Sequence, residues 1–280
     1  MKVLFTIFGI HVHFFGVMIA VGMLAGIFVA YLEVKRKGLN TEKLFDLTLY
    51  TMISAVVGAR LFYIIFYNLP YYLENPVEII KITEGGLSIH GGLIGAFIAG
   101  LIYIKKNKLS FFKYADAIAP GIILGQGIGR VGCDVFGKAM NTPMPWGVQQ
   151  GGQLLHPAQV YEFILNYLVF FILWRKRKNI KYDGQLFGWY IVLFSINRSV
   201  VELFRTNPAI AGWFSVSHLL SAIFIIGALI IMFAIKKRRT MELDTDCDIK
   251  AVEKSSLVLD ILIISAITIA SLIIFYAVQG

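Results

Sequence analysis

The stretch LLSAIFIIGALIIMFAIKKRR, residues 219–239, decides the class of fold. Its apolar part is long enough for one membrane-spanning helix, because a span needs about 20 mostly apolar residues. Similar runs recur along the chain. We expect eight spans, roughly at 12–34, 46–67, 87–104, 114–133, 158–174, 184–204, 215–235 and 256–278. The sequence therefore predicts an all-α membrane protein, a polytopic bundle of seven core transmembrane helices plus one extra C-terminal transmembrane helix.

The composition agrees with a membrane protein. Of the 280 residues, 58% are hydrophobic and 15% are charged, whereas soluble domains carry about 25% charged residues. The net charge of +9 could suggest nucleic-acid binding, but the basic residues lie in short clusters between apolar runs, so no nucleic-acid partner is expected. Cys133 and Cys247 do not form a Cys-x-x-Cys motif, and no thiolate metal site is expected.

Four basic clusters predict the orientation in the membrane. They follow the first, third, fifth and seventh runs and hold most of the 26 lysines and arginines, at 35–43, 105–113, 175–181 and 236–254. All four lie on one side if every run crosses the membrane. Basic loops stay in the cytoplasm. The sequence therefore predicts both termini on the outer side and retention of the N-terminal run as a first span.

Several ionisable residues lie within or beside the apolar runs, near their outer ends. They are Arg60, His90, Arg130, Glu162, Arg198, Glu202 and Arg205. Charged groups within spans are costly and usually functional. Because several of them share one predicted depth, the group could hold an anionic phospholipid headgroup through charge-assisted hydrogen bonds.

Each of these residues also has a structural interpretation. Arg198 and Glu202 are spaced i, i+4 and could form an ion pair that only stabilises a helix. His90 could tie two helices together by hydrogen bonding. Arg60 and Arg130 could snorkel to the interface. The clustering of all of them, rather than any single residue, favours a functional site.

The glycines predict helix packing. Gly127-x-Gly129-x-x-Gly132 has the letters of a dinucleotide fingerprint, but it ends a span and no strand precedes it, so no cofactor is expected. Gly121, Gly125 and Gly129 are spaced by four, and Gly91 and Gly95 repeat that spacing. Such patterns allow close approach of helix backbones in membranes.

Six strings occur in the order typical of one family. They are 58–61 (GARL), 84–95 (EGGLSIHGGLIG), 129–132 (GRVG), 145–148 (PWGV), 156–162 (HPAQVYE) and 198–205 (RSVVELFR). Over about residues 5–236 the chain resembles the bacterial prolipoprotein diacylglyceryl transferases. The resemblance divides the chain into a transferase-like transmembrane domain at 1–240, a cytoplasmic linker at 241–255 and an additional helix at 256–280.

The resemblance implies a reaction at the bacterial inner membrane. A diacylglyceryl group passes from phosphatidylglycerol to the thiol of the lipobox cysteine in a prolipoprotein signal peptide, giving a thioether and glycerol phosphate. Membrane lipids are further partners, and no cofactor or metal is implied. The resemblance makes four residues catalytic, namely His90, Arg130, Arg198 and Glu202. It places seven in substrate binding: Arg60, Gly91, Gly92, Gly129, Gly147, Glu162 and Arg205.

General chemistry assigns roles to the four expected catalytic residues. A thiol reacts as its thiolate, and His90 could accept the thiol proton. Arg130 and Arg198 could neutralise the phosphate as it leaves. Glu202, one helical turn from Arg198, could orient that guanidinium.

The chain departs from the family pattern in places. Cys133-Asp134 stands where the family usually has Asn-Phe, Phe15 stands where a tyrosine is common, and His218 replaces a common glutamine. Cys133 could be a substitute polar group, a reactive thiol or a small packing residue, and we favour packing. The alternatives are a non-catalytic or altered-specificity phospholipid-binding protein of the same fold and a small-anion transporter. An intramembrane serine hydrolase is disfavoured because the chain has no Gly-x-Ser-x-Gly elbow.

Overall fold

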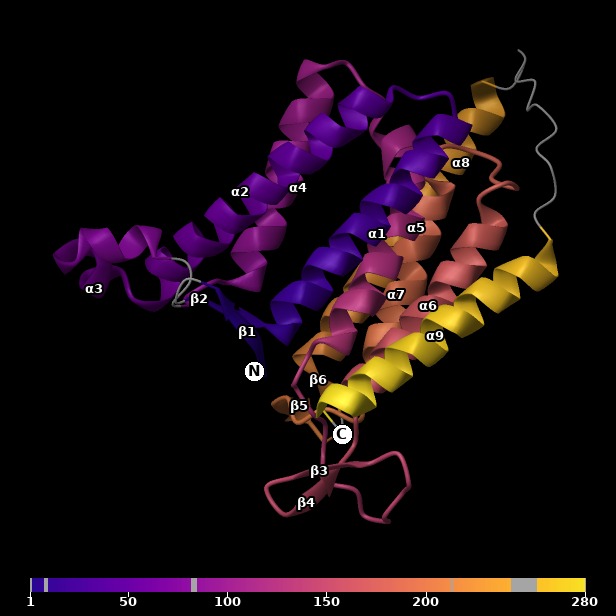
Figure 1. Cartoon of the computed structure of the whole chain (residues 1–280). Helices are drawn as coiled ribbons and strands as arrows, with labels where there is room; N and C mark the ends of the chain where they lie inside the picture. Colours follow the sequence, from indigo (N-terminus) through magenta and orange to yellow (C-terminus); the bar gives the residue numbers. More distant parts are fainter. Residues whose placement is uncertain (1, 8–9, 82–84, 213, 243–255, 280) are drawn as a thin grey trace. The chain divides into compact units, whose positions relative to one another are not determined.

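The computed structural model describes residues 2–7, 10–81, 85–212, 214–242 and 256–279. Within them, every predicted apolar run forms a long helix (Figure 1). The helices are α1 (Phe14–Arg36), α2 (Thr41–Tyr67), α4 (Ile89–Lys106), α5 (Phe111–Val131), α6 (Ala158–Lys176), α7 (Gln185–Glu202), α8 (Val216–Glu242) and α9 (Leu257–Gln279). The predicted all-α polytopic membrane fold is confirmed.

Five of these helices are long and apolar enough to cross a membrane, namely α1, α2, α4, α8 and α9. The other three, α5, α6 and α7, carry the charged residues of the site described below. That all eight helices cross stays a prediction. The predicted linker at 241–255 begins within α8, which continues to Glu242, and its remainder with Cys247 lies outside the described residues.

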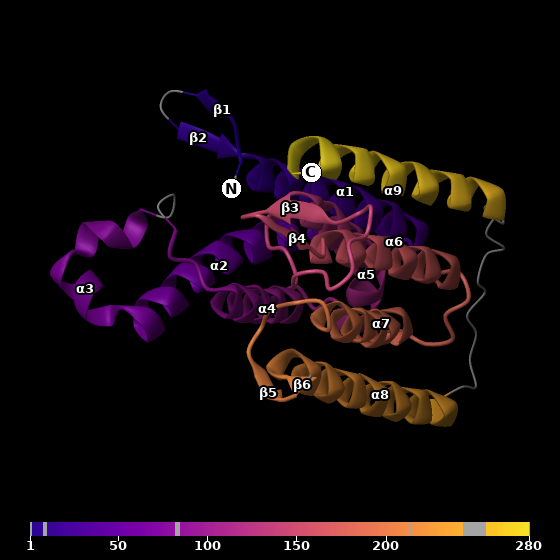
Figure 2. The same cartoon turned by 90° about the horizontal axis from the view of Figure 1, so that it is seen from below.

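The chain divides into two compact units. Unit 1 comprises Met1–Leu32 and Ala115–Gly280, and unit 2 comprises Glu33–Tyr114. In unit 1, α6 lies between α7 and α9, and α8 packs on α7, as two perpendicular views agree (Figures 1 and 2). In unit 2, α2 and α4 pack along each other.

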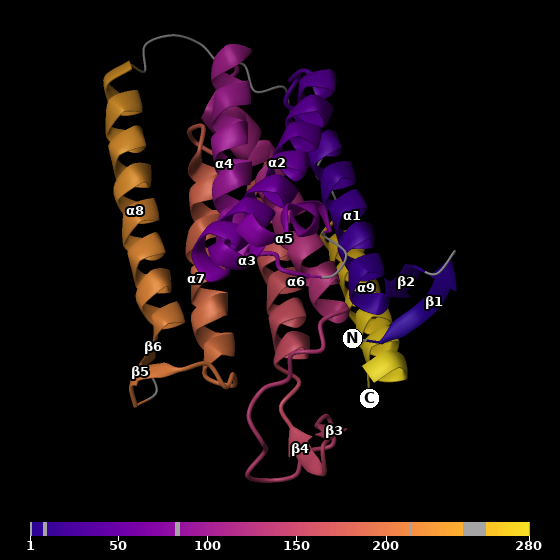
Figure 3. The ribbon, with the colours of Figure 1, turned by 90° about the vertical axis from the view of Figure 1, so that its left-hand side faces the viewer.

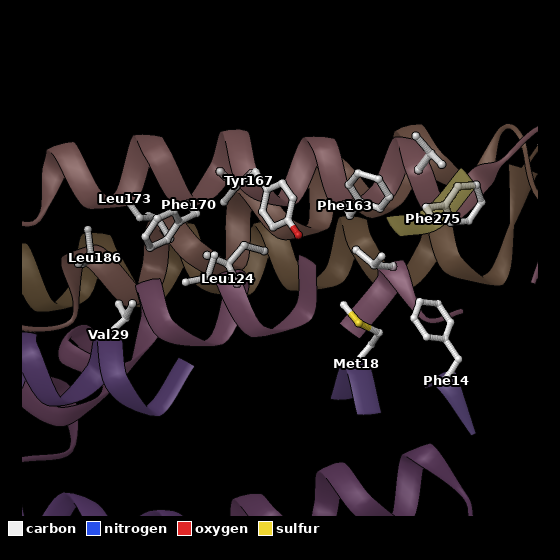
Figure 4. Close-up of a cluster of buried hydrophobic side chains, with 14 of the residues drawn as sticks. Phe14, Met18, Val29, Leu124, Phe163, Tyr167, Phe170, Leu173, Leu186 and Phe275 are labelled. Atoms are coloured by element: carbon white, nitrogen blue, oxygen red, sulfur yellow. The ribbon is translucent and has the colours of Figure 1, made fainter. Parts of the chain in front are cut away.

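The core of unit 1 includes the extra C-terminal helix. Phe163 of α6 and Phe275 of α9 are both fully buried, and their ring centroids lie 6.4 Å apart. Figure 4 shows these two rings beside Phe14 and Met18 of α1, within one apolar cluster. Burying one large apolar side chain contributes roughly 1.5–3 kcal/mol. The α9 helix is therefore an integral part of this unit.

Small residues set the approach of α1 to α5 in unit 1. A Cβ atom at Gly22 would lie 2.5 Å from the carbonyl oxygen of Gly125, and one at Gly26 would lie 2.7 Å from that of Gly121. In unit 2 a Cβ atom at Gly58 would lie 2.6 Å from the Gly91 oxygen. These contacts confirm the helix-packing role predicted for the glycines spaced by four.

The substitution Gly125→Ala tests the contact between α1 and α5. The new Cβ would lie 2.7 Å from the Gly22 oxygen, and overpacking costs roughly 1–3 kcal/mol. We expect a lower melting temperature in detergent. Gly227→Ala on α8 is the matched control, because nothing lies within 4 Å of its Cβ position. Equal melting temperatures for the two variants would contradict this packing.

Three short antiparallel hairpins were not predicted. They pair β1 (Val3–Ile7) with β2 (Ile10–His13), β3 (Val148–Gln150) with β4 (Gln153–Leu155), and β5 (Ala209–Ala211) with β6 (Phe214–Ser215). The first predicted span began at residue 12, but α1 begins at Phe14 because residues 12–13 belong to β2. Gly151 and Gly152 both have positive φ, 55° and 80°, as a tight hairpin turn requires. Figure 3 shows the β3–β4 hairpin extending past the end of α6.

The segment between α2 and α4 contains two short helices. They are α3 (Leu69–Glu74) and the 3-10 helix η1 (Pro76–Ile80). Each has a proline in its first turn, where the missing N–H costs nothing and the fixed φ suits a helix start. Both prolines therefore lie where a helix begins.

Candidate active site

One buried carboxylate stands at the centre of a group of arginines in unit 1. Glu162, in the second turn of α6, has a side chain that is 2% exposed. Its Oε1 atom lies 3.0 Å from Arg130 Nε, at the end of α5. Its Oε2 atom lies 4.0 Å from Arg198 Nη1 and 3.9 Å from Arg205 Nη1. The structure thus brings together four of the predicted site residues from three parts of the chain.

A second carboxylate fixes the position of Arg198. Glu202 Oε2 lies 3.1 Å from Arg198 Nη2, one helical turn away on α7. The same carboxylate accepts hydrogen bonds from Asn207 Nδ2, at 2.8 and 3.0 Å, and from Ser215 Oγ at 2.9 Å. Because three hydrogen bonds from Asn207 and Ser215 hold Glu202, the Arg198 side chain that pairs with it has a fixed orientation.

No pattern in the sequence pointed to Asn207 and Ser215. Neither residue belongs to a charged cluster or to a recognisable string. Ser215 ends the β5–β6 hairpin, and its hydroxyl also lies 3.1 Å from His218 Nδ1. His218, the departure from the family pattern, therefore supports the residue that holds Glu202.

The cluster has an excess of positive charge. Three guanidinium groups face two carboxylates, and the side chains of Arg130, Arg198 and Arg205 are 32%, 22% and 15% exposed. Burial lowers the pKa of the Arg205 guanidinium, and the charge of Arg198 lowers it further. A bound anion would oppose both effects.

Two buried nitrogen atoms of the cluster, Arg198 Nη1 and Arg205 Nε, have no hydrogen-bond partner within the described structure. Buried donors are normally satisfied, and leaving one unpaired is costly. An incoming phosphate supplies several strong acceptors and suits the guanidinium fork. The cluster is therefore suited to bind a phosphate group.

The turn after α5 carries Cys133 beside Arg130. Cys133 is buried and free, and its Sγ atom lies 3.6 Å from Arg130 Nη1. Gln159 Nε2 donates to the Cys133 carbonyl at 3.3 Å. The thiol is thus in polar contact with Arg130, and the packing role expected for it stays a prediction.

An aromatic group orders the loop at 134–157. Tyr161, next to Glu162 on α6, accepts a hydrogen bond from Trp146 Nε1 at 3.0 Å, and its hydroxyl lies 3.0 Å from His156 Nδ1. The His156 ring packs on Phe204, with centroids 5.3 Å apart. A Cβ atom at Gly147 would lie 2.6 Å from Leu154 Cγ. Packing within the loop thus explains Gly147, and its contact with substrate stays a prediction.

In unit 2, His90 lies in the first turn of α4. It is the second residue of α4 and is exposed, and its ring centroid lies 6.5 Å from that of Phe62. Among the described residues its ring nitrogens have no hydrogen-bond partner. The structural role and the base role of His90 both stay predictions. Its proximity to Arg130 stays a prediction.

The two glycines after His90 pack towards α2 within unit 2. Gly91 approaches the Gly58 backbone, and a Cβ atom at Gly92 would lie 3.4 Å from the Ala55 oxygen. Close helix packing accounts for both glycines. The same reason applies to Gly129 of unit 1, where a Cβ atom would lie 3.1 Å from Ile19 Cδ1. Their predicted contact with substrate remains a prediction.

Arg60 anchors the segment that precedes His90. Its buried guanidinium lies 5.1 Å from the Tyr72 ring centroid. Its five N–H donors match five backbone carbonyls, those of Glu78, Ile79, Lys81, Gly85 and Gly86, at 2.5–3.3 Å. The structure thus gives Arg60 a structural role, and its direct contact with substrate stays a prediction. Glu84 of the same string lies outside the described residues.

These features define a class of protein. A polytopic helical membrane protein that gathers three arginines around a buried carboxylate at its helix ends is suited to handle an anionic lipid group. Among the described residues, no group of three or more His, Cys, Asp or Glu could hold a metal ion.

Comparison with known proteins identifies the family. The model of the prolipoprotein diacylglyceryl transferase family matches residues 2–234, and the chain belongs to this family. The recognition made from the sequence strings is confirmed. The α9 helix lies beyond the matched residues.

Curated relatives support the assignment. A phosphatidylglycerol–prolipoprotein diacylglyceryl transferase of Clostridioides difficile (strain 630) is 37% identical, over 85% of this chain and 96% of the relative. A relative of the same name from Finegoldia magna is 37% identical with the same coverage. One from Staphylococcus aureus (strain MSSA476) is 39% identical, over 73% of this chain and 78% of the relative.

Proposed function

We propose that this chain transfers the diacylglyceryl group of phosphatidylglycerol to the thiol of a prolipoprotein lipobox cysteine, the first step of lipoprotein maturation. The relatives' names state both substrates. The observation that carries the proposal is the arginine cluster around Glu162, with two buried donors that a phosphate could satisfy.

The reaction breaks the bond between the glycerol carbon of the diacylglyceryl group and its phosphate oxygen. A carbon–sulfur bond forms in its place, the thiol proton goes to His90, and glycerol phosphate leaves. A phosphodiester becomes a phosphomonoester, so a second negative charge develops on the leaving group. Arg130 and Arg198 stabilise that charge, because preorganised donors act most strongly where charge develops. Glu202 keeps the Arg198 guanidinium in place.

Depletion of the resident enzyme in a bacterial host tests the proposed function in cells. We expect the chain to restore growth and lipidation of a reporter prolipoprotein. An Arg198→Ala variant of equal abundance serves as the inactive control. Phosphatidylglycerol binding without any lipidation would favour the phospholipid-binding alternative.

The helix positions argue against an anion transporter. Arg130, Glu162 and Arg198 lie near helix ends instead of midway along the helices.

The chain is an integral protein of the bacterial inner membrane, and we propose that both termini lie on the outer side with 241–255 in the cytoplasm. Labelling with a membrane-impermeant thiol reagent tests this orientation. Cys247 should react only after the membrane is opened, and a cysteine introduced by Gly280→Cys should react in intact spheroplasts. Cys133 is buried, and a Cys133→Ser background removes its signal. Labelling of both positions from one side would contradict the orientation.

A further inference from the structure

The α9 helix lies beyond the residues that match the family model, yet it is bonded into unit 1 along its length. Near its start, the buried Asp260 lies 3.0 Å from Arg175 Nη1 of α6. Further along, Ser271 Oγ lies 2.8 Å from Tyr167 Oη. Polar contacts within a membrane hold helices together, so α9 has a defined register on α6.

The last turn of α9 reaches the turn that follows Arg130. Gln279 Nε2 donates to the Gly132 carbonyl at 3.2 Å. Two weak backbone bonds close this turn, from Gly132 N to Gly129 O at 3.3 Å and from Cys133 N to Arg130 O at 3.2 Å. The final carbonyls of a helix have no partner within the helix. Gln279 therefore supplies an external partner at the point where α5 ends.

The same turn of α9 also reaches the loop beside Glu162. Tyr276 Oη donates to the Trp146 carbonyl at 2.7 Å. The Trp146 indole in turn donates to Tyr161, the residue before Glu162. The Gln279 bond holds the turn that follows Arg130, and the Tyr276 bond holds the loop beside Glu162. Arg130 and Glu162 form an ion pair at 3.0 Å, so each bond supports one member of that pair.

We infer that Tyr276 and Gln279 are positioning residues for the transfer reaction. They hold the turn at Gly132 and the loop at Trp146, and through them they fix Arg130 against Glu162 in the geometry that receives the phosphate. The inference rests on the proposed function. A displacement of about 1 Å in an active site can lower the rate about 10²-fold. Loss of the two hydrogen bonds that hold the turn and the loop can therefore lower the rate of transfer.

The test uses the full chain with Tyr276→Phe and Gln279→Met combined. Each change removes the hydrogen-bond donor, keeps the approximate size of the side chain and adds no charge. We expect kcat to fall about 10- to 100-fold, with KM for the thiol peptide and the melting temperature near the original values. Ile273→Ala is the matched control on α9, because Ile273 is 64% exposed; it should change neither kcat nor melting temperature.

A second comparison separates positioning from general stabilisation. Asp260→Asn weakens the far end of α9, and it should lower the melting temperature while kcat, measured well below that temperature, stays unchanged. In an Arg130→Lys background the double substitution should lower kcat only slightly further, because the guanidinium that Tyr276 and Gln279 position is gone. Additive losses in that background, or an unchanged kcat in the double variant, would overturn the inference.

Binding of glycerol phosphate, measured on the same samples, separates failure of the inference from failure of the proposed function. Weaker binding by the double variant supports positioning even in a chain that does not catalyse transfer. If the chain catalyses no transfer and the double variant binds glycerol phosphate as the unmodified chain does, both the function and the inference fail. An active chain with equal rate and equal binding in the double variant rejects the positioning role alone.

Discussion

Replacement of either arginine of the phosphate site by alanine is expected to abolish measurable diacylglyceryl transfer. Loss of one preorganised donor that stabilises developing charge costs roughly 10²–10³ in rate. Arg130→Ala also removes the ion pair to Glu162 Oε1, and Arg198→Ala removes the partner of Glu202. Membrane insertion should persist, because neither residue lies in one of the five helices that are long and apolar enough to cross a membrane. Lipidation of a thiol peptide by equal amounts of inserted protein provides the measurement.

Lysine at these positions should restore only part of the activity, because an ammonium group cannot make the bidentate contact. Lys106→Ala removes an exposed charge from unit 2 and should retain full activity. An alanine variant leaves a buried carboxylate without its partner, which lowers stability, so Arg130→Ala combined with Glu162→Gln is a useful companion. Full activity in both alanine variants would rule out the phosphate-binding role.

The second large effect is expected at His90. His90→Gln should fold and bind lipid but transfer roughly 10²–10⁴ times more slowly, the usual loss for a missing acid–base group. Glutamine keeps a donor and an acceptor yet cannot take a proton near neutral pH. Folding should be unaffected because the described structure shows no hydrogen bond from this imidazole. The residual rate should rise with pH as more of the acceptor thiol ionises, since a free thiol has a pKa of about 8.5.

Peptide lipidation by His90→Gln and His90→Ala between about pH 6 and 9 distinguishes base catalysis from a structural role. A structural His90 would tolerate glutamine and lose protein yield with alanine. A His90→Gln protein with the original rate and pH profile would eliminate the base assignment. The thiol would then need another proton acceptor, such as Glu162 or water at the outer face.

The helices could be predicted from the sequence because each apolar run is long and ends at basic or turn-forming residues. The arginine cluster could be predicted in outline, because charged residues in a membrane are rare and Arg130, Glu162 and Arg198 fall at one expected depth. The strings that resemble the family supplied the rest of the site. Prediction and structure agree best for the long apolar helices and for the charged residues near their ends, because a charge in the membrane carries a large free-energy cost.

Other features of the structure depend on contacts that no sequence pattern indicates. Asn207 and Ser215 hold Glu202, yet both are ordinary polar residues of a connecting segment. Asp116 of α5 is fully buried, and its carboxylate accepts hydrogen bonds from the backbone amides of Gly184 and Phe187 at the start of α7. The hairpins are only two to five residues per strand, too short for a periodic signal. Such features depend on which distant segments meet, which one sequence does not specify locally.

The most direct test of the central claim uses the purified chain in vesicles of phosphatidylglycerol with a peptide that contains a lipobox cysteine. Mass spectrometry follows the peptide, and a separate assay follows released glycerol phosphate. The account predicts a peptide heavier by one diacylglyceryl group, joined through a thioether, and an equal amount of glycerol phosphate. Vesicles of phosphatidylcholine and a peptide with serine in place of cysteine should give neither product. An unmodified peptide and no glycerol phosphate, from protein that is folded and inserted, would contradict the account.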